Sequence, residues 1–207
     1  MVHQSRWPAV SRVLMAVLPV LATACGGPAP RKTRFQVVDF RDGQAPQRYF
    51  EDFDECYYAR DPNGNMDVVA RRSGPLNDDP DETFAEVLHL HGIWRAVPGV
   101  TAVETTQINT TVSYWITGDS GGVGFEGGGF VVFHENRKGD VLTGELELSI
   151  LRPMRQVADA PVLFQRAELT GQFRATHDKR RVVRILNEME RYFGPMPRYE
   201  PAPPGPL

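Results

Sequence analysis

The sequence predicts a mainly β protein: an antiparallel β-sandwich or barrel-like sheet with one C-terminal α-helix. Between residues 34 and 175, stretches rich in β-branched and aromatic residues alternate with short runs of glycine, proline, asparagine and aspartate, as strands alternate with turns. Residues 142–150 alternate apolar and polar side chains, which is typical of an antiparallel strand with one wet face. Apolar residues recur at helical spacing over residues 179–193. Many strands followed by one helix favour a sheet that closes or folds onto itself.

The first predicted strand covers residues 34–40. Residues 49–60 and 66–72 flank a turn at residues 61–65, in which proline presets one φ angle and Asn63-Gly64 accepts positive φ. A second turn at residues 136–140 joins two further strands. The later strands are predicted over residues 84–97, 101–117, 130–133, 141–151 and 167–175, with a glycine-rich connection between Thr117 and Phe130.

The predicted helix carries an apolar stripe that would lie on the sheet. Thr176 or Asp178 can cap its first turn, and Gly194 followed by Pro195 ends it. The stripe consists of Val182, Ile185, Leu186, Met189 and Phe193.

The first 25 residues carry a targeting signal. Arg6 and Arg12 precede an apolar run and then Ala22-Thr23-Ala24-Cys25, the order found in secretory signal peptides. The run spans about 12 residues, whereas a membrane-spanning helix needs roughly 20. A cysteine directly after the small residues resembles the lipobox of bacterial lipoproteins. That resemblance implies cleavage before Cys25, lipidation of its thiol and amine, and, because Gly26 follows, the outer rather than the inner membrane of the cell envelope.

The predicted domain organisation follows from this signal. Residues 1–24 are a signal peptide, 25–33 a lipidated tether, 34–194 a single β-rich domain, and 195–207 a proline-rich disordered tail. Lipidation of Cys25 leaves one further cysteine, Cys56, so no intrachain disulfide is expected. A formal net charge of −3 argues against a nucleic-acid partner, since phosphate binding needs a basic face.

Two histidines are the candidate metal ligands. His89 and His91 are two residues apart, so on a strand they share a face, and two imidazoles can ligate zinc when a third ligand joins them. His134 or Glu135, or His177 or Asp178, would supply that ligand if folding brought them close. No metal site is assigned on the sequence alone.

Three short motifs resemble known sites. Gly118-Asp119-Ser120-Gly121-Gly122 resembles the nucleophile segment of chymotrypsin-like serine proteases, but the family's spacing to histidine is missing. Residues 61–67 resemble part of a calcium loop without its closing glutamate, which favours an ordinary hairpin turn. Gly92-Ile93-Trp94 resembles the Gly-x-Trp of lipocalins, which implies a ligand-holding barrel. No catalytic residue and no cofactor is assigned.

The sequence therefore predicts a membrane-anchored cell-envelope lipoprotein and favours a binding or structural role, holding an envelope protein, polymer or small ligand, over an enzymatic one. One alternative is an envelope hydrolase or metal-dependent enzyme that uses His89 and His91. It requires both imidazoles and a third ligand to converge on one point in a cleft. The other alternative is a carrier of a small ligand or lipid, which requires an apolar cavity inside a closed barrel.

Overall fold

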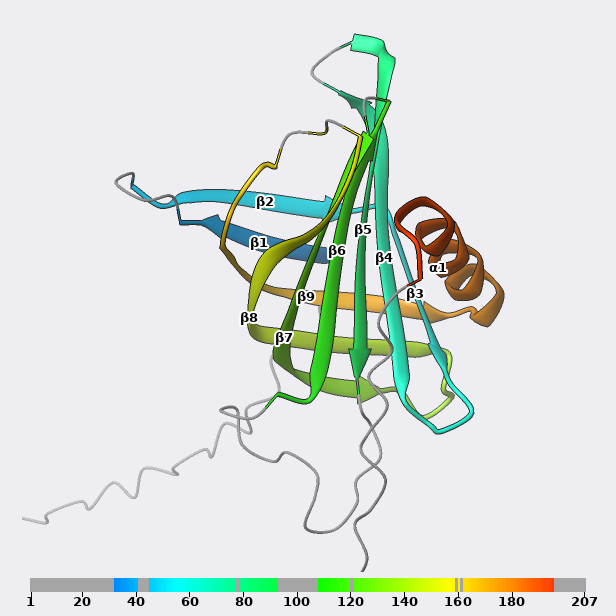
Figure 1. The fold of residues 1–207 in the computed structure, drawn as a ribbon. Coiled ribbons are helices and arrows are strands. Elements are labelled where there is room, and N and C mark those ends of the chain that lie inside the picture. Colours follow the sequence, from blue (N-terminus) through cyan, green and yellow to red (C-terminus); the bar gives the residue numbers. More distant parts are fainter. Residues whose placement is uncertain are drawn as a thin grey trace, which may run out of the picture.

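The computed structural model describes residues 32–40, 45–76, 79–92, 108–119, 121–158, 160 and 162–195. Within this part of the chain the fold is mainly β with one C-terminal helix, as predicted (Figure 1). The elements are β1 (Thr33–Asp39), β2 (Gln47–Phe53), β3 (Glu55–Arg60), β4 (Met66–Leu76), β5 (Asp79–Gly92), β6 (Thr110–Gly118), β7 (Gly121–Glu135), β8 (Val141–Val157), β9 (Ala167–His177) and α1 (Lys179–Phe193).

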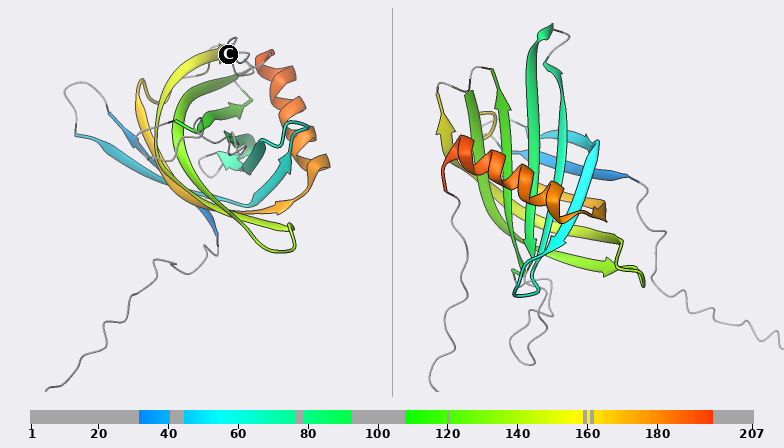
Figure 2. Two further views of the ribbon diagram at one scale, coloured as in Figure 1. Left: turned by 90° about the horizontal axis from the view of Figure 1, so that it is seen from below. Right: turned by 90° about the vertical axis from the view of Figure 1, so that its right-hand side faces the viewer.

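The strands close into a barrel. Their order is β2-β1-β9-β3-β4-β5-β6-β7-β8, and β8 pairs back with β9 to complete a ring of seven strands. Every ring contact is antiparallel except β3–β9, which runs parallel. Of the two predicted architectures, the barrel-like sheet is therefore the correct one. β1 shares with β3 one edge of β9, so β1 and β2 extend to one side of the ring (Figure 2).

Two hydrophobic clusters lie on opposite sides of the barrel wall. The inner cluster fills the barrel with large side chains. The outer cluster lies between the wall and α1, which packs along the outside of the ring (Figure 2). β5 contributes to both, since Leu88 and Leu90 point inward and Val87 points outward. The outer cluster comprises Ala59, Val69, Val87, Trp115, Val182, Ile185, Met189 and Phe193.

Helix α1 begins and ends as its sequence predicts. Of the two candidate caps, Asp178 is the one used, and its carboxylate accepts a hydrogen bond from the Arg181 backbone N–H at 3.0 Å. Gly194 follows the last turn with φ 83°, a backbone angle that glycine adopts without a steric penalty.

The predicted glycine-rich connection between Thr117 and Phe130 is wrong, because strand β7 begins at Gly121. The glycines allow close packing instead of bending a loop. A Cβ at Gly122 would lie 2.8 Å from Tyr192 and 2.9 Å from Phe193, and one at Gly124 would lie 3.0 Å from Trp115. The absent side chains leave room for the end of α1 and for the outer cluster.

Two smaller differences concern predicted segments. β1 begins at Thr33, which the prediction gave to the tether, and the Thr33 side chain hydrogen-bonds the Arg174 backbone. The predicted signal peptide, Cys25 and the proline-rich stretch from residue 196 lie outside the described residues, as do residues 93–107 of two predicted strands.

Candidate metal centre

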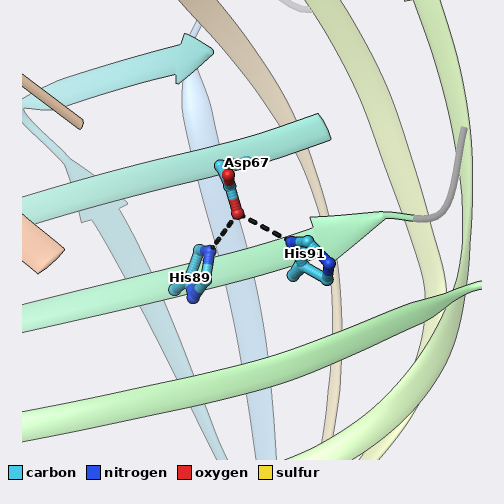
Figure 3. Close-up of side chains that lie close together, drawn as sticks. All are labelled: Asp67, His89 and His91. Atoms are coloured by element: carbon cyan, nitrogen blue, oxygen red, sulfur yellow. Dashed lines mark hydrogen bonds and ion pairs between the residues drawn. The ribbon is translucent and has the colours of Figure 1, made fainter. Parts of the chain in front are cut away.

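The β4–β5 register places three metal-ligating side chains together on the outer face of the barrel. Asp67 on β4 lies opposite His91 on β5, and Val69 lies opposite His89. Because Leu88 and Leu90 point into the barrel, His89 and His91 point away from it. Figure 3 shows both imidazole rings turned toward the carboxylate of Asp67.

The three side chains converge on one carboxylate oxygen. Asp67 Oδ1 lies 2.9 Å from His89 Nε2 and 2.8 Å from His91 Nδ1. One ligand atom from each residue lies within 4.8 Å of the other two. The side chains of Asp67, His89 and His91 are 18%, 12% and 22% exposed, so the cluster is shielded from water but open on one side.

Neighbouring side chains fix the orientation of this cluster. The His89 ring stacks on the indole of Trp115 with centroids 6.1 Å apart, and Trp115 is buried under α1. Asp67 follows the 61–65 turn closely. In that turn the carboxylate of Asp61 accepts hydrogen bonds from the backbone N–H groups of Asn63 and Asn65, both at 2.8 Å. The hairpin-turn interpretation of this segment is confirmed, and the Asp61 carboxylate serves as a hydrogen-bond acceptor within the turn.

The electrostatics of the cluster favour an ionised carboxylate. Burial raises the pKa of Asp67, but the hydrogen bonds and charges of His89 and His91 outweigh burial and hold it far below its ordinary range. The hydrogen bond to Asp67 raises the pKa of His91, although burial opposes that shift. The site therefore concentrates negative charge at one oxygen and holds a proton beside it, where a cation could replace the proton.

Two imidazoles and one carboxylate form a ligand set suited to Zn²⁺ and related divalent transition metals. Three protein ligands leave at least one coordination position for water or for a group from another molecule. Two grooves of the described part of the chain lie elsewhere: one lies between β4, β5, β6 and Tyr192, the other along the outer face of α1. The candidate centre lies on the outer face of the barrel wall, because its histidines point away from the interior.

The four residues considered as third ligand lie elsewhere. Glu135 accepts hydrogen bonds from the Tyr58 hydroxyl at 2.9 Å and from Arg60 at 2.6 Å, while the His177 ring packs against Tyr58. Asp178 caps α1, and His134 on β7 pairs in the sheet with Thr143. The third side chain that could ligate a metal is Asp67, which the sequence assigns to the calcium-like turn.

No protein-family model, curated protein or solved structure matches this chain. Among the described residues, no helix is long and apolar enough to cross a membrane.

Two other candidates from the sequence have different roles. Cys56 packs against the inner cluster, and burial raises the pKa of its thiol to about 12. The thiol therefore stays protonated, and Cys56 packs as a small hydrophobic residue rather than acting as a nucleophile. In the protease-like motif, Ser120 lies outside the described residues, and Asp119 accepts hydrogen bonds from Thr83.

Another polar cluster lies on the inner face of the barrel wall and joins side chains of β2, β4 and β5. Arg72 Nη2 lies 2.6 Å from Glu51 and 2.9 Å from Glu86, and the Tyr114 hydroxyl also hydrogen-bonds Glu86. Burial raises the pKa of both carboxyl groups, and Arg72 opposes that shift. Within the described chain, Glu86 Oε2 and Arg72 Nε have no hydrogen-bond partner. This cluster ties β2 to the ring.

Proposed function

We propose that the chain is a lipid-anchored cell-envelope protein whose barrel binds a divalent transition-metal ion, with Zn²⁺ as the best fit, at Asp67, His89 and His91. The observation that carries the metal proposal is the convergence of two imidazole nitrogens and a carboxylate oxygen within 4.8 Å. The ligand types are those that zinc prefers, and three of them on a rigid two-strand support preorganise the site.

The surface position of the site favours binding over catalysis. Catalytic centres normally lie in clefts that enclose most of a small substrate, whereas this site sits on the outer barrel wall. An open coordination position on the outer wall can instead accept a ligand from a large partner, such as an envelope protein or polymer. The carrier alternative finds less support, since buried side chains that include Phe35, Tyr58 and Phe125 fill the interior.

The metal proposal is tested by calorimetric titration of the purified protein with Zn²⁺ and by absorption spectroscopy after loading with Co²⁺. One ion should bind per chain, and the Co²⁺ spectrum should report nitrogen and oxygen ligands in a site of low coordination number. His89→Ala, His91→Ala and Asp67→Asn should each weaken binding at least tenfold, in line with loss of one of three ligands.

His134→Ala is the matched control, because His134 is an exposed strand histidine outside the cluster. It should leave Zn²⁺ affinity unchanged. Equal loss of binding in the control and in His89→Ala would contradict the assignment, as would a wild-type protein that takes up no metal.

The anchor part of the proposal rests on the sequence around Cys25. Several long acyl chains on one residue would hold the protein firmly to a leaflet, because each buried methylene contributes about 0.8 kcal/mol. Mass spectrometry of the mature N-terminus should find an acylated Cys25, and Cys25→Ser should release the protein from the membrane fraction. A free thiol on a protein that still sediments with membranes would refute the anchor while leaving the metal site standing.

A further inference from the structure

Strand β2 is the terminal strand of the sheet. Within the described residues β1 is its strand partner on one side, and the other side pairs with no strand. An unpaired strand edge presents a row of backbone donors and acceptors that can pair with another strand. The β1–β2 pair also extends away from the ring (Figures 1 and 2), and the first four residues of β2, Gln47 to Phe50, are exposed.

The same strand exposes two aromatic side chains. Phe50 is 63% exposed and Tyr49 is 41% exposed. Arg48, Phe50 and Asp52 share the outward face of β2, because the inward face is marked by buried Phe53. Large exposed aromatic residues beside an open strand edge are typical of an interaction surface.

The charges on this strand are complementary to themselves. If two copies of β2 pair antiparallel with Phe50 at the centre, Arg48 lies opposite Asp52 of the partner subunit, and Phe50 lies opposite the partner subunit's Phe50. A shift by two residues that centres the pair on Glu51 sets two like charges opposite each other. A shift by one residue turns each outward side chain to the other face. The central register therefore matches charge and apolar contacts together.

Arg48 forms no ion pair with any described residue. Asp52 already accepts hydrogen bonds from Arg34, its cross-strand neighbour on β1, and in the dimer it would lie between Arg34 and the partner subunit's Arg48. The C-terminal segment of the chain is a poor alternative occupant of the edge, since prolines at six positions of residues 195–207 remove backbone donors.

We propose that β2 pairs antiparallel with β2 of a second copy of this chain, in the register that sets Phe50 against its symmetry mate, and so forms a two-fold dimer through a continuous sheet. The dimer does not depend on the metal site, because β2 contributes no ligand to that centre.

Disulfide trapping tests the register. In Phe50→Cys the two introduced thiols would face each other across the two-fold axis, where directly opposed Cβ atoms lie about 4.5–5.5 Å apart. A covalent dimer should form on mild oxidation of the full-length protein. Met154→Cys is the control, because Met154 on β8 is 62% exposed yet lies off the proposed interface. Equal crosslinking at both positions, or none at position 50, would overturn the proposal.

Charge exchange gives a second test that needs no crosslink. Arg48→Asp and Asp52→Arg should each weaken self-association at least tenfold in sedimentation velocity with EDTA present, since each sets like charges opposite each other. An equimolar mixture of the two variants should recover dimers, because each variant then supplies the charges that the other needs. A monomeric wild type, or a mixture that stays monomeric while both variants bind Zn²⁺ normally, would refute the β2 dimer without touching the metal proposal.

Discussion

At the scale of single residues, Asp67 decides the chemistry of the candidate centre. Its Oδ1 atom is the common partner of both imidazoles, so it orients them toward each other even when no ion is bound. A carboxylate that two histidines already hold in place loses little conformational freedom when a cation replaces a proton. The same contact makes the protonation of His91 dependent on Asp67.

Replacing the carboxylate should therefore change the titration of His91. In Asp67→Asn the hydrogen bond to a carboxylate and the charge of that carboxylate, which both raise the pKa of His91, are lost, and that pKa should move down toward the ordinary histidine value of about 6.5. NMR titration of the imidazole protons measures the shift, with His134→Ala as a reference that should leave His91 unchanged. An unchanged pKa for His91 in Asp67→Asn would mean that the two side chains do not interact in solution.

The contact between His91 and Asp67 makes the stability of the fold depend on pH. A histidine whose folded pKa is raised stabilises the fold fully below the unfolded pKa and loses that contribution as pH rises through the folded pKa. Asp67 shows the opposite dependence, since its lowered pKa contributes stability that is lost only in strong acid. The His91–Asp67 contact therefore contributes most at mildly acidic pH, whereas metal binding, which needs deprotonated imidazole, strengthens as pH rises.

At the scale of elements, the glycines of β7 control how closely α1 approaches the barrel. Gly122 leaves space for the aromatic rings of Tyr192 and Phe193 at the end of the helix. Arg155 then reaches the helix end and donates hydrogen bonds to the Phe193 and Gly194 carbonyl groups at 3.0 and 3.2 Å, which satisfies backbone acceptors that a helix end leaves unpaired.

A methyl group at Gly122 should push this helix end away. Gly122→Ala should lower the free energy of unfolding by about 1–3 kcal/mol, as overpacking does, and urea denaturation measures the loss. Gly74→Ala is the matched strand control, because its Cβ would meet only Phe84, at an ordinary contact distance of 3.7 Å. Equal destabilisation by both variants would show that loss of a strand glycine, rather than helix contact, sets the effect.

Periodicity predicted the elements better than their connections. The alternation in residues 142–150 and the apolar stripe of residues 179–193 each report burial within one segment, and both segments adopt the predicted structure. The sequence predicts a loop for the glycines of β7 because the role of these glycines depends on α1, about 70 residues later in the chain. Local composition carries no information about a partner that distant.

For the same reason, the sequence predicts only part of the candidate site. The two-residue spacing of His89 and His91 predicts their shared face, which the structure shows. Asp67 comes from the neighbouring strand, so its proximity depends on the β4–β5 register. The sequence does carry a signal for Asp67. Asp67, Val69 and Arg71 alternate with inward residues on β4, and pairing that strand with β5 places Asp67 beside a histidine.

At the scale of the whole molecule, the Glu51–Arg72–Glu86 cluster joins the extended β1–β2 pair to the ring. One guanidinium serves two carboxylates there, and burial raises the pKa of both. Such a cluster contributes little net stability while intact, but removing one partner leaves buried charge without compensation. Arg72 therefore links β2 to the ring in addition to the pairing of β2 with β1.

Arg72→Met should cost about 3 kcal/mol of folding free energy at pH 7. The folded pKa values of Glu51 and Glu86 lie above their unfolded values, so these carboxyl groups take up protons at a higher pH in the folded state than in the unfolded state. Part of the lost folding free energy should therefore be recovered as pH falls toward 5. Denaturant unfolding of wild type and variant at both pH values measures this. A variant whose deficit stays constant between pH 5 and 7 would contradict the assignment.

The parallel contact between β3 and β9 has a consequence for how the chain folds. It joins Tyr57 and Tyr58 to Thr176 and His177, so the ring can close only when nearly the entire domain has been synthesised. Contacts this distant in sequence slow folding, because loop-closure entropy must be overcome before they form. A chain that ends before β9 would keep β3 and β8 as open strand edges, and such edges favour aggregation over native assembly.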